Sequence, residues 1–245
     1  MPRALALETS GRTGSVAAVE DGAVVAEDQF PHGLQHAAGL VPMIDRLCRA
    51  RDWAPADVEE IYVSAGPGSF TGLRVGVTVA KTLALATGAR IVAVPTAEVL
   101  ARNAPAGWQN LIVVLDAKRD QIFTATFVND GNGTPVVREA ARLDSLAAVL
   151  ARTGRPVHLI GEGIPFHQKF IPRGDPFIFV TASESWRARA AAVAEVGYAM
   201  ARRGEFVDPD RLTPVYVRRP EAEEKLEERV GQSGGSGSTA GKPAR

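Results

Sequence analysis

The sequence contains one cysteine, few aromatic residues, no excess of charge of either sign and no apolar run that could span a membrane. Its 245 residues include 28 basic and 28 acidic side chains, so no overall field attracts nucleic acid or a membrane surface. Cys48 alone cannot form an intramolecular disulfide, and no signal peptide is recognisable at the N-terminus. We therefore expect a cytoplasmic protein. Arg74 and Lys81 interrupt the most apolar stretch, so no transmembrane helix is expected.

One order of strands and helices occurs twice along the chain. In the first half, hydrophobic periodicity and turn residues predict strands at 3–9, 14–20, 23–30, 60–65 and 90–94, and helices at 35–50 and 70–87. In the second half they predict strands at 111–117, 121–128, 134–140, 156–163 and 177–182, and helices at 145–153 and 185–204. A weak helix is predicted at 164–170. Two copies of βββαβαβ predict an α/β protein with two lobes about a cleft. This order resembles the duplicated actin-like (ASKHA) fold of sugar kinases and Hsp70 proteins.

The lobe boundary follows from the repeat. We expect an N-terminal lobe at 1–103 and a C-terminal lobe at 104–220, with the long helix 185–203 able to pack across both. Residues 221–245 begin as a short acidic helix and continue as a Gly/Ser-rich tail that cannot bury enough apolar surface to order itself.

The segment "GPGSFTGLR", residues 66–74, joins a predicted strand to a predicted helix. A P-loop would need lysine and then serine or threonine after its last glycine, whereas "LR" follows here. A nucleophile elbow would need serine between glycines at alternate positions, and "GPGSFTG" lacks that pattern. Two interpretations remain open: a tight turn in which Ser69 or Thr71 caps the helix, and an anion contact at the helix N-terminus.

An actin-like ATPase would need a carboxylate at the end of the first strand and two small-residue turns around the phosphates. The first half offers Glu8 followed by the candidate cofactor-binding residues Thr9, Ser10 and Gly11. The second half offers 116–120, which contains no glycine, and Gly161 and Gly163 could flank an adenine. Half of the phosphate cradle is missing, so neither ATP hydrolysis nor sugar phosphorylation by the chain alone is expected.

Metal-site motifs are incomplete as well. His32 and His36 stand four residues apart, but Gly33 occupies the place of a zinc peptidase's general base, and no third ligand cluster accompanies them. No metal site and no catalytic residue are therefore assigned.

The helix at 70–87 is apolar over most of its circumference. Gly72, Gly76, Ala80 and Ala84 form a smooth ridge beside a stripe of larger apolar residues. Either the helix at 35–50 covers the excess apolar area, or both helices offer it to a second protein. The second hypothesis gives the following partner interface: Leu40, Met43, Ile44, Leu47, Arg74, Val75, Val79 and Leu83.

Four segments carry a resemblance to a known family: "LALETSGRTGSVAAVEDG", "SAGPGSFTGLRVGVTVAKTLALATG", "VLDAKRDQIFTATF" and "LTPVYVRRPEAEEKL". They resemble the TsaB (YeaZ) family, accessory subunits of the bacterial machinery that makes threonylcarbamoyladenosine in tRNA. The resemblance extends to about residue 230, and the Gly66–Arg74 segment is its most specific part. The Gly/Ser-rich tail lies outside it.

The resemblance implies a non-catalytic scaffold, required with TsaD and TsaE for threonylcarbamoyl transfer to the adenosine adjacent to the anticodon of tRNA. TsaD, the catalytic relative, carries a metal-binding histidine pair after the strand that follows the shared glycine turn, whereas residues 94–100 here contain no histidine. The resemblance implies that TsaD binds residues 35–50 and 70–87. It also implies that tRNA binds the assembled complex and that ATP or ADP binds only at the interface within that complex.

It also implies that the chain can form a homodimer through the same face when TsaD is absent. Two rival hypotheses are kept: a metal-dependent glycoprotease-type peptidase and a stand-alone actin-fold ATPase.

Overall fold

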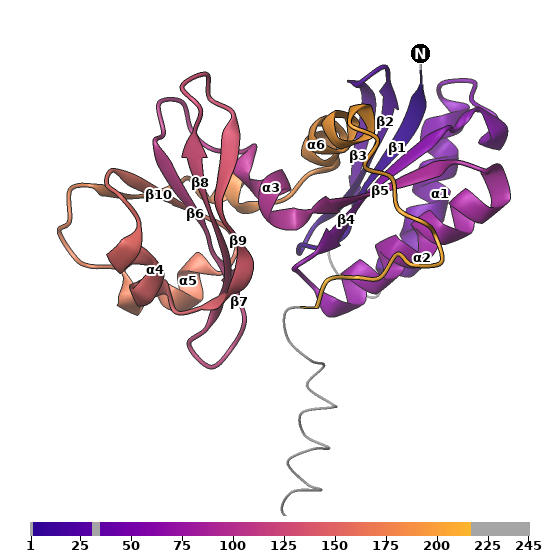
Figure 1. Cartoon of the computed structure of the whole chain (residues 1–245). Helices are drawn as coiled ribbons and strands as arrows, with labels where there is room; N and C mark the ends of the chain where they lie inside the picture. The colour runs from indigo at the N-terminus through magenta and orange to yellow at the C-terminus, as the bar shows by residue number, and fades with distance from the viewer. Residues whose placement is uncertain (1, 31–34, 217–245) are drawn as a thin grey trace, which may run out of the picture.

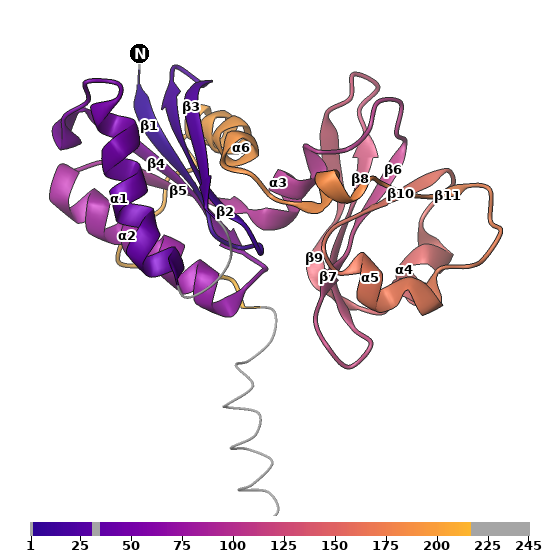
Figure 2. The same ribbon diagram turned by 180° about the vertical axis from the view of Figure 1, so that it is seen from behind.

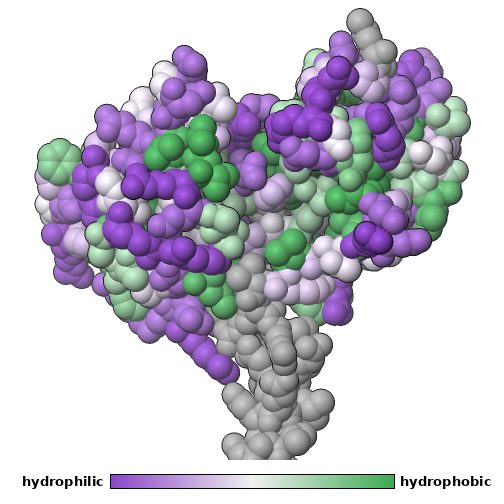
Figure 3. Space-filling model, in the orientation of Figure 1, coloured by the Kyte–Doolittle hydropathy of each residue, from purple (hydrophilic) through white to green (hydrophobic). Residues whose placement is uncertain are grey.

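The computed structural model describes residues 2–30 and 35–216. The chain forms two lobes, each built on one β-sheet (Figure 1), and the molecular surface is indented between them (Figure 3). The sheet of the first lobe has the order β3-β2-β1-β4-β5, in which β1, β4 and β5 are parallel and β2 is antiparallel to both neighbours. Its strands are β1 (Arg3–Glu8), β2 (Gly14–Glu20), β3 (Ala23–Phe30), β4 (Glu60–Gly66) and β5 (Arg90–Pro95).

The sheet of the second lobe has the order β11-β10-β6-β8-β7, and β9 also pairs with β8. Its strands are β6 (Asn110–Val113), β7 (Leu115–Asp116), β8 (Ile122–Asn129), β9 (Pro135–Asp144), β10 (Val157–Ile160) and β11 (Ile178–Val180). The α-helices are α1 (Gln35–Arg49), α2 (Phe70–Thr87), α3 (Thr96–Ala101), α4 (Leu146–Arg152), α5 (Ile164–His167) and α6 (Ala190–Arg202), and the short 3₁₀ helices are η1 (Pro55–Asp57), η2 (Gln168–Phe170) and η3 (Ser183–Trp186).

Side-chain alternation along β1 determines which helices cover each face of the first sheet. Leu5 and Leu7 belong to the core under α1 and α2, whereas Ala4 and Ala6 belong to the core under α6. Figures 1 and 2 show α1 and α2 together on one side of this sheet and α6 on the other. The small alanines allow α6 to approach closely. A methyl group on Gly197 of α6 would lie 2.5 Å from the ring of Tyr62.

The two lobes repeat one topology. Each places three strands, a helix, a strand, a helix, a strand and a final helix in that order. The first sheet order, β3-β2-β1-β4-β5, corresponds to β9-β8-β6-β10-β11 in the second. The duplicated actin-like fold predicted from the sequence is therefore confirmed, with β7 as a short additional strand where a single strand at 111–117 was expected.

The lobe boundary differs from the sequence-based expectation. α6, which was expected to be able to pack across both lobes, packs on the first sheet, so the chain returns to the first lobe after β11, within the segment expected for the second lobe. The helix predicted at 185–204 begins only at Ala190, after η3 and an extended segment. The unpredicted helix α3 packs against strands of both sheets, so one hydrophobic core runs from α6 through α3 into the second lobe. The acidic helix and tail predicted for 221–245 lie outside the described residues.

The ridge of small residues on α2 faces the backbone that follows β1. A methyl group on Gly72 would lie 1.9 Å from the carbonyl oxygen of Thr9, and one on Gly76 would lie 2.3 Å from the Thr9 hydroxyl. Gly68, just before the helix, is equally close, because its methyl group would lie 2.6 Å from the Ser10 carbonyl oxygen. Gly68, Gly72 and Gly76 therefore allow a close approach between the helix and the end of the strand.

We predict that Gly72→Ala destabilises the fold even though alanine favours helices. The added methyl group meets a backbone oxygen that cannot rotate away, and overpacking of this kind costs up to about 3 kcal/mol. For a chain of this size, thermal unfolding should shift down by about 2–4 °C per kcal/mol.

Gly39→Ala in α1 is the matched control, because nothing lies within 4 Å of its added methyl group. That variant should gain up to about 1 kcal/mol from helix propensity. Equal melting temperatures for the two variants would contradict the close-approach explanation.

Candidate functional site

A cavity of about 240 Å³ lies between the lobes, where actin-like proteins have their cleft. The first lobe contributes the turn after β1 and the start of α2, and the second lobe contributes β7, β8 and the loop before α5. The lining residues are Ser10, Gly11, Arg12, Gly68, Ser69, Leu115, Asp116, Phe123, Glu162, Gly163 and Phe166. The volume is below the roughly 300–1,000 Å³ of small-molecule pockets.

Glu8, the carboxylate at the end of β1, is bonded within the first lobe. Its side chain is fully buried. One carboxylate oxygen accepts hydrogen bonds from the backbone N–H and the hydroxyl of Ser10, both at 2.5 Å, and the other accepts one from the hydroxyl of Ser64. Burial raises the pKa of Glu8, and the donors from Ser10 and Ser64 offset this only in part. Glu8 does not line the cavity.

The three candidate cofactor-binding residues do not act together. Ser10 and Gly11 line the cavity, but Thr9 is buried under α2 and its hydroxyl has no hydrogen-bond partner. The N–H of Ser69 donates to the Ser10 carbonyl oxygen at 2.7 Å, so one of the unpaired amides near the start of α2 is already used. Thr9 packs against Gly72 and Gly76 of α2, and its cofactor role stays a prediction.

Ser69 caps α2, as one of the two sequence-based interpretations expected. Its hydroxyl accepts the N–H of Gly72 at 3.3 Å, which satisfies a second amide of the first turn. The alternative cap, Thr71, is exposed inside the helix.

The second-lobe wall of the cavity carries a carboxylate, Asp116, that is bonded as Glu8 is. Asp116 lies 3.0 Å from Nε2 of the buried His167, and it accepts the backbone N–H of Lys118 at 3.2 Å. The turn from β7 to β8 has three successive residues with positive φ: Lys118 at 61°, Arg119 at 52° and Asp120 at 58°. These left-handed residues carry side chains where a phosphate-binding turn would have glycine.

Arg12 connects the two lobes across the mouth of the cavity. Its backbone N–H donates to the Glu162 carboxylate at 3.3 Å, and its guanidinium lies 5.7 Å from the centre of the Phe166 ring. Sequence reasoning did not find this contact, because the partners are 150 residues apart. The two carboxylates that line the cavity, Asp116 and Glu162, both belong to the second lobe, and both are engaged by other groups of the chain.

The predicted partner interface is partly corrected by burial. Leu40, Met43, Ile44 and Leu47 all lie in the core between the first sheet and α1, so they are not available to a partner. Val75, Val79 and Leu83 are half-buried and pack against the same core. The exposed face of the two helices consists of neighbouring residues instead, including Val41, which is 50% exposed, and Leu85, which is 75% exposed.

Arg74 is exposed but already has partners. Its guanidinium lies 3.8 Å from the centre of the Phe70 ring, and its Nε donates to the Tyr216 hydroxyl at 2.9 Å. Tyr216 belongs to a strap that runs, over the described residues 207–216, from β5 to the start of α2. The Val207 N–H donates to Ile91, and the Val215 N–H donates to Ala65 at 2.7 Å. Nothing local in the sequence indicates this strap, since the contacts that attach it to β5 and α2 are long-range.

Within residues 2–30 and 35–216, no group of three or more His, Cys, Asp and Glu side chains is arranged to hold a metal ion. His32 lies outside this part of the chain. None of the helices described is both long enough and apolar enough to cross a membrane.

Comparison with known proteins gives consistent matches. The family model described as "TsaD: tRNA N6-adenosine threonylcarbamoyltransferase" matches residues 33–200. The tRNA threonylcarbamoyladenosine biosynthesis protein TsaB of Bacillus subtilis is 32% identical over 225 residues, 90% of this chain and 96% of that protein. The TsaB protein of Escherichia coli is 30% identical over 134 residues, 54% of this chain and 57% of its own length.

A solved structure agrees with these sequence matches. YeaZ from Pseudomonas aeruginosa superimposes with a TM-score of 0.75 at 25% sequence identity. The match covers 88% of this chain and all of that one.

We predict that Glu8→Gln folds and becomes more stable relative to the unsubstituted protein as pH rises from 4 to 7. The pKa of Glu8 is higher in the folded state than the ordinary 4.5, so Glu8 favours folding below 4.5 and loses that contribution as pH rises through the folded pKa. Glutamine has no charge to bury, and its amide can still accept from Ser10 and donate to the Ser64 hydroxyl.

Urea unfolding of both proteins across this pH range measures the difference. Glu184→Gln, at an exposed position, is the control and should show no such trend. A stability difference that stays constant with pH would contradict a desolvated Glu8.

Proposed function

Because the chain belongs to the TsaB (YeaZ) family of tRNA threonylcarbamoyladenosine biosynthesis, we propose that it is a non-catalytic scaffold subunit of this process. It works with TsaD and TsaE in the transfer of a threonylcarbamoyl group to the adenosine adjacent to the anticodon of tRNA. The observation that carries the proposal is a family match over nearly the whole length, together with a cleft whose carboxylates bond to the chain's own groups.

The non-catalytic part of the proposal rests on the cleft. Glu8 is held by two serines, Asp116 by His167, and Glu162 by the backbone of Arg12. A carboxylate that already accepts hydrogen bonds on the oxygens it would need for a metal-bound water must first give those bonds up. We therefore place any ATP or ADP at an interface with TsaD rather than inside this cavity.

The docking part of the proposal rests on the outer faces of α1 and α2. Among the exposed residues of α2, Arg74 alone is charged, and it is held by Phe70 and Tyr216. Depletion of charge is the compositional mark of an interface core. Figure 3 shows apolar residues between polar ones over the part of the first lobe near α2.

The charged residues of α1 suit the rim of such an interface. Arg46 pairs with Asp28 at 2.9 Å, and Arg49 pairs with Asp45 at 2.9 Å. Neither arginine needs a partner from another chain, so the two pairs can border a contact centred on Val41 and α2. We propose that TsaD binds this face, and that a second copy of the chain occupies it when TsaD is absent.

The rival hypotheses have less support in the side chains. A metallopeptidase needs a set of metal ligands, and no three candidate ligands group within the described part of the chain. A stand-alone ATPase needs a backbone cradle on both sides of the phosphates, and the turn at residues 118–120 does not have the glycines for one.

Reconstitution tests the proposed function. With TsaD, TsaE, tRNA and the remaining components, we expect threonylcarbamoyladenosine to form only when this chain is added, and we expect no product from this chain alone. Mass spectrometry of tRNA nucleosides measures the product. Full modification without this chain would refute the scaffold role, and modification by this chain without TsaD would refute its non-catalytic character.

We predict that Thr78→Glu combined with Leu85→Glu abolishes pairing with TsaD. These exposed residues are seven positions apart, so they share one face of α2, and an unpaired carboxylate buried in an interface costs several kcal/mol, a loss of more than about 100-fold in affinity. Co-purification and analytical ultracentrifugation measure the pairing.

The matched control is Val136→Glu combined with Val137→Glu, which adds the same charge to exposed apolar positions of β9 in the second lobe. It should bind TsaD as the unsubstituted chain does. If both double variants bind TsaD normally, the outer face of α2 is not the docking surface.

A further inference from the structure

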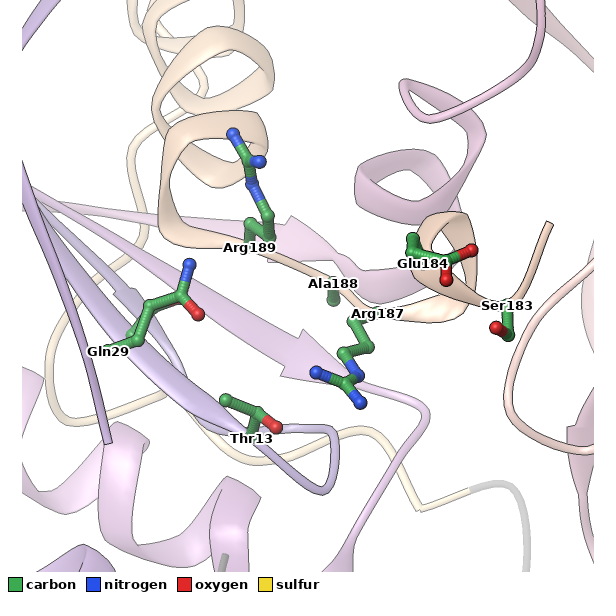
Figure 4. Close-up of a pocket in the computed structure, with 8 residues that line it drawn as sticks. Thr13, Gln29, Ser183, Glu184, Arg187, Ala188 and Arg189 are labelled. Atoms are coloured by element: carbon green, nitrogen blue, oxygen red, sulfur yellow. The ribbon is translucent and has the colours of Figure 1, made fainter. Parts of the chain in front are cut away.

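A second cavity, of about 250 Å³, lies where the chain crosses back from the second lobe to the first. One side is formed by β2, β3 and the turn before β2, and the other by η3 and the extended segment that precedes α6 (Figure 4). The lining residues are Thr13, Ser15, Gln29, Ser183, Glu184, Arg187, Ala188 and Arg189. The cavity is distinct from the cleft cavity, with which it shares no lining residue.

The first amides of α6 are not free to bind a ligand in this cavity. The N–H of Ala190 donates to the Ser15 hydroxyl at 2.8 Å, and the N–H of Ala191 donates to the Glu27 carboxylate at 3.0 Å. Any binding function must therefore come from side chains. The Thr13 hydroxyl, the Gln29 amide and the Arg187 guanidinium line the cavity, and none of them has a hydrogen-bond partner within the described residues.

Arg187 differs from most arginines of the described residues. Most of the others either pair with a carboxylate, as Arg152 does with Asp144 at 2.6 Å, or lie over an aromatic ring, as Arg90 does over Phe206. Arg187 has neither kind of partner in that part of the chain, yet it lines a concave site. Figure 4 shows its guanidinium extending toward Thr13 while the Glu184 carboxylate points away from it.

The backbone on either side of Arg187 is fixed. The side-chain amide of Asn103, just after α3, donates to the carbonyl oxygens of Ser185 at 3.0 Å and Arg187 at 2.8 Å. The indole of Trp186 donates to the carbonyl oxygen of Thr181 at 3.0 Å, and Ala188 is buried. An arginine whose backbone is held in this way loses less freedom when it binds a ligand.

The acidic groups near the cavity leave Arg187 unneutralised. The Glu27 carboxylate lies 3.7 Å from the Arg189 guanidinium and also accepts the Ala191 N–H, so it already has two partners other than Arg187. Glu184 lies at the other end of the lining and its carboxylate faces outward (Figure 4). The donors that remain are a guanidinium, an amide and a hydroxyl, which are the groups that recognise phosphate oxygens.

We propose that this cavity binds a phosphate group, with Arg187 as the principal ligand and Thr13 and Gln29 as neutral donors. Its volume is below the roughly 300–1,000 Å³ of pockets that enclose a drug-sized ligand, so it accommodates the phosphate and leaves the rest of the ligand outside. The phosphate belongs either to a small phosphorylated molecule or to the backbone of an RNA. The site does not depend on the proposed scaffold role.

In the first arm of the test, the full chain is titrated with inorganic phosphate and with AMP. Binding is measured from the NMR chemical shifts of the Arg187 and Gln29 side chains. Arg187→Gln should weaken binding at least about ten-fold, because a hydrogen bond between charged groups is lost. Arg187→Lys should bind with intermediate affinity, since it keeps the charge without the planar fork. Arg202→Gln is the matched control, an exposed arginine in the last turn of α6 that does not line the cavity, and should not change binding.

The second arm measures the affinity of the full chain for unmodified tRNA at several salt concentrations. If the phosphate belongs to RNA, Arg187→Gln reduces the slope of log affinity against log salt by about one, and Arg202→Gln does not. If Arg187→Gln weakens the binding of phosphate and AMP but not of tRNA, the ligand is a small phosphorylated molecule. If Arg187→Gln changes the binding of tRNA, the ligand is RNA. If Arg187→Gln changes neither phosphate, AMP nor tRNA binding while its melting temperature is unaltered, the proposal is wrong.

Discussion

The close approach of α2 to the backbone after β1 is the contact on which the first-lobe wall of the cleft depends. The Ser69 N–H binds the Ser10 carbonyl oxygen, and Gly72 brings the helix against Thr9. This contact fixes the end of β1, so it determines where Glu8 is buried and where Arg12 leaves the first lobe. Arg12 in turn reaches Glu162, so the position of one helix turn also places a contact between the lobes, beside the hydrophobic core that joins them through α3.

The same contact occupies the backbone polar groups of the turn that follows β1. In an actin-like ATPase the turn after the first strand must present its amides to phosphate. In this chain the Ser10 amide donates to Glu8, and the Ser10 carbonyl accepts from α2. A turn held on both sides by its own neighbours is a rigid structural element. That rigidity suits a protein whose proposed role is to present helix faces to a partner.

Much of the fold could be predicted from the sequence because its signals are local. Alternation in residues 3–9, the Asp21-Gly22 turn and the apolar spacing of residues 70–87 each depend on neighbours within a few positions. The repeat of these signals was enough to give the actin-like duplication. α3 escaped prediction because six residues, Thr96–Ala101, are too few to show a helical period. The return of α6 to the first lobe depends on Ser15 and Glu27, which no spacing rule connects to Ala190.

The candidate interface shows the limit of reading helices one at a time. Leu40 and Ile44 have the spacing of an apolar face, but periodicity cannot tell whether such a face meets a sheet of its own chain or another protein. The strap that ends at Tyr216 has a consequence of a different kind. The N-terminus emerges at one end of the first lobe, whereas the described chain ends at the other, beside the start of α2 (Figure 1). A fluorescent reporter fused to the N-terminus would stand away from the mouth of the cleft, whereas one inserted directly after residue 216 would begin next to it.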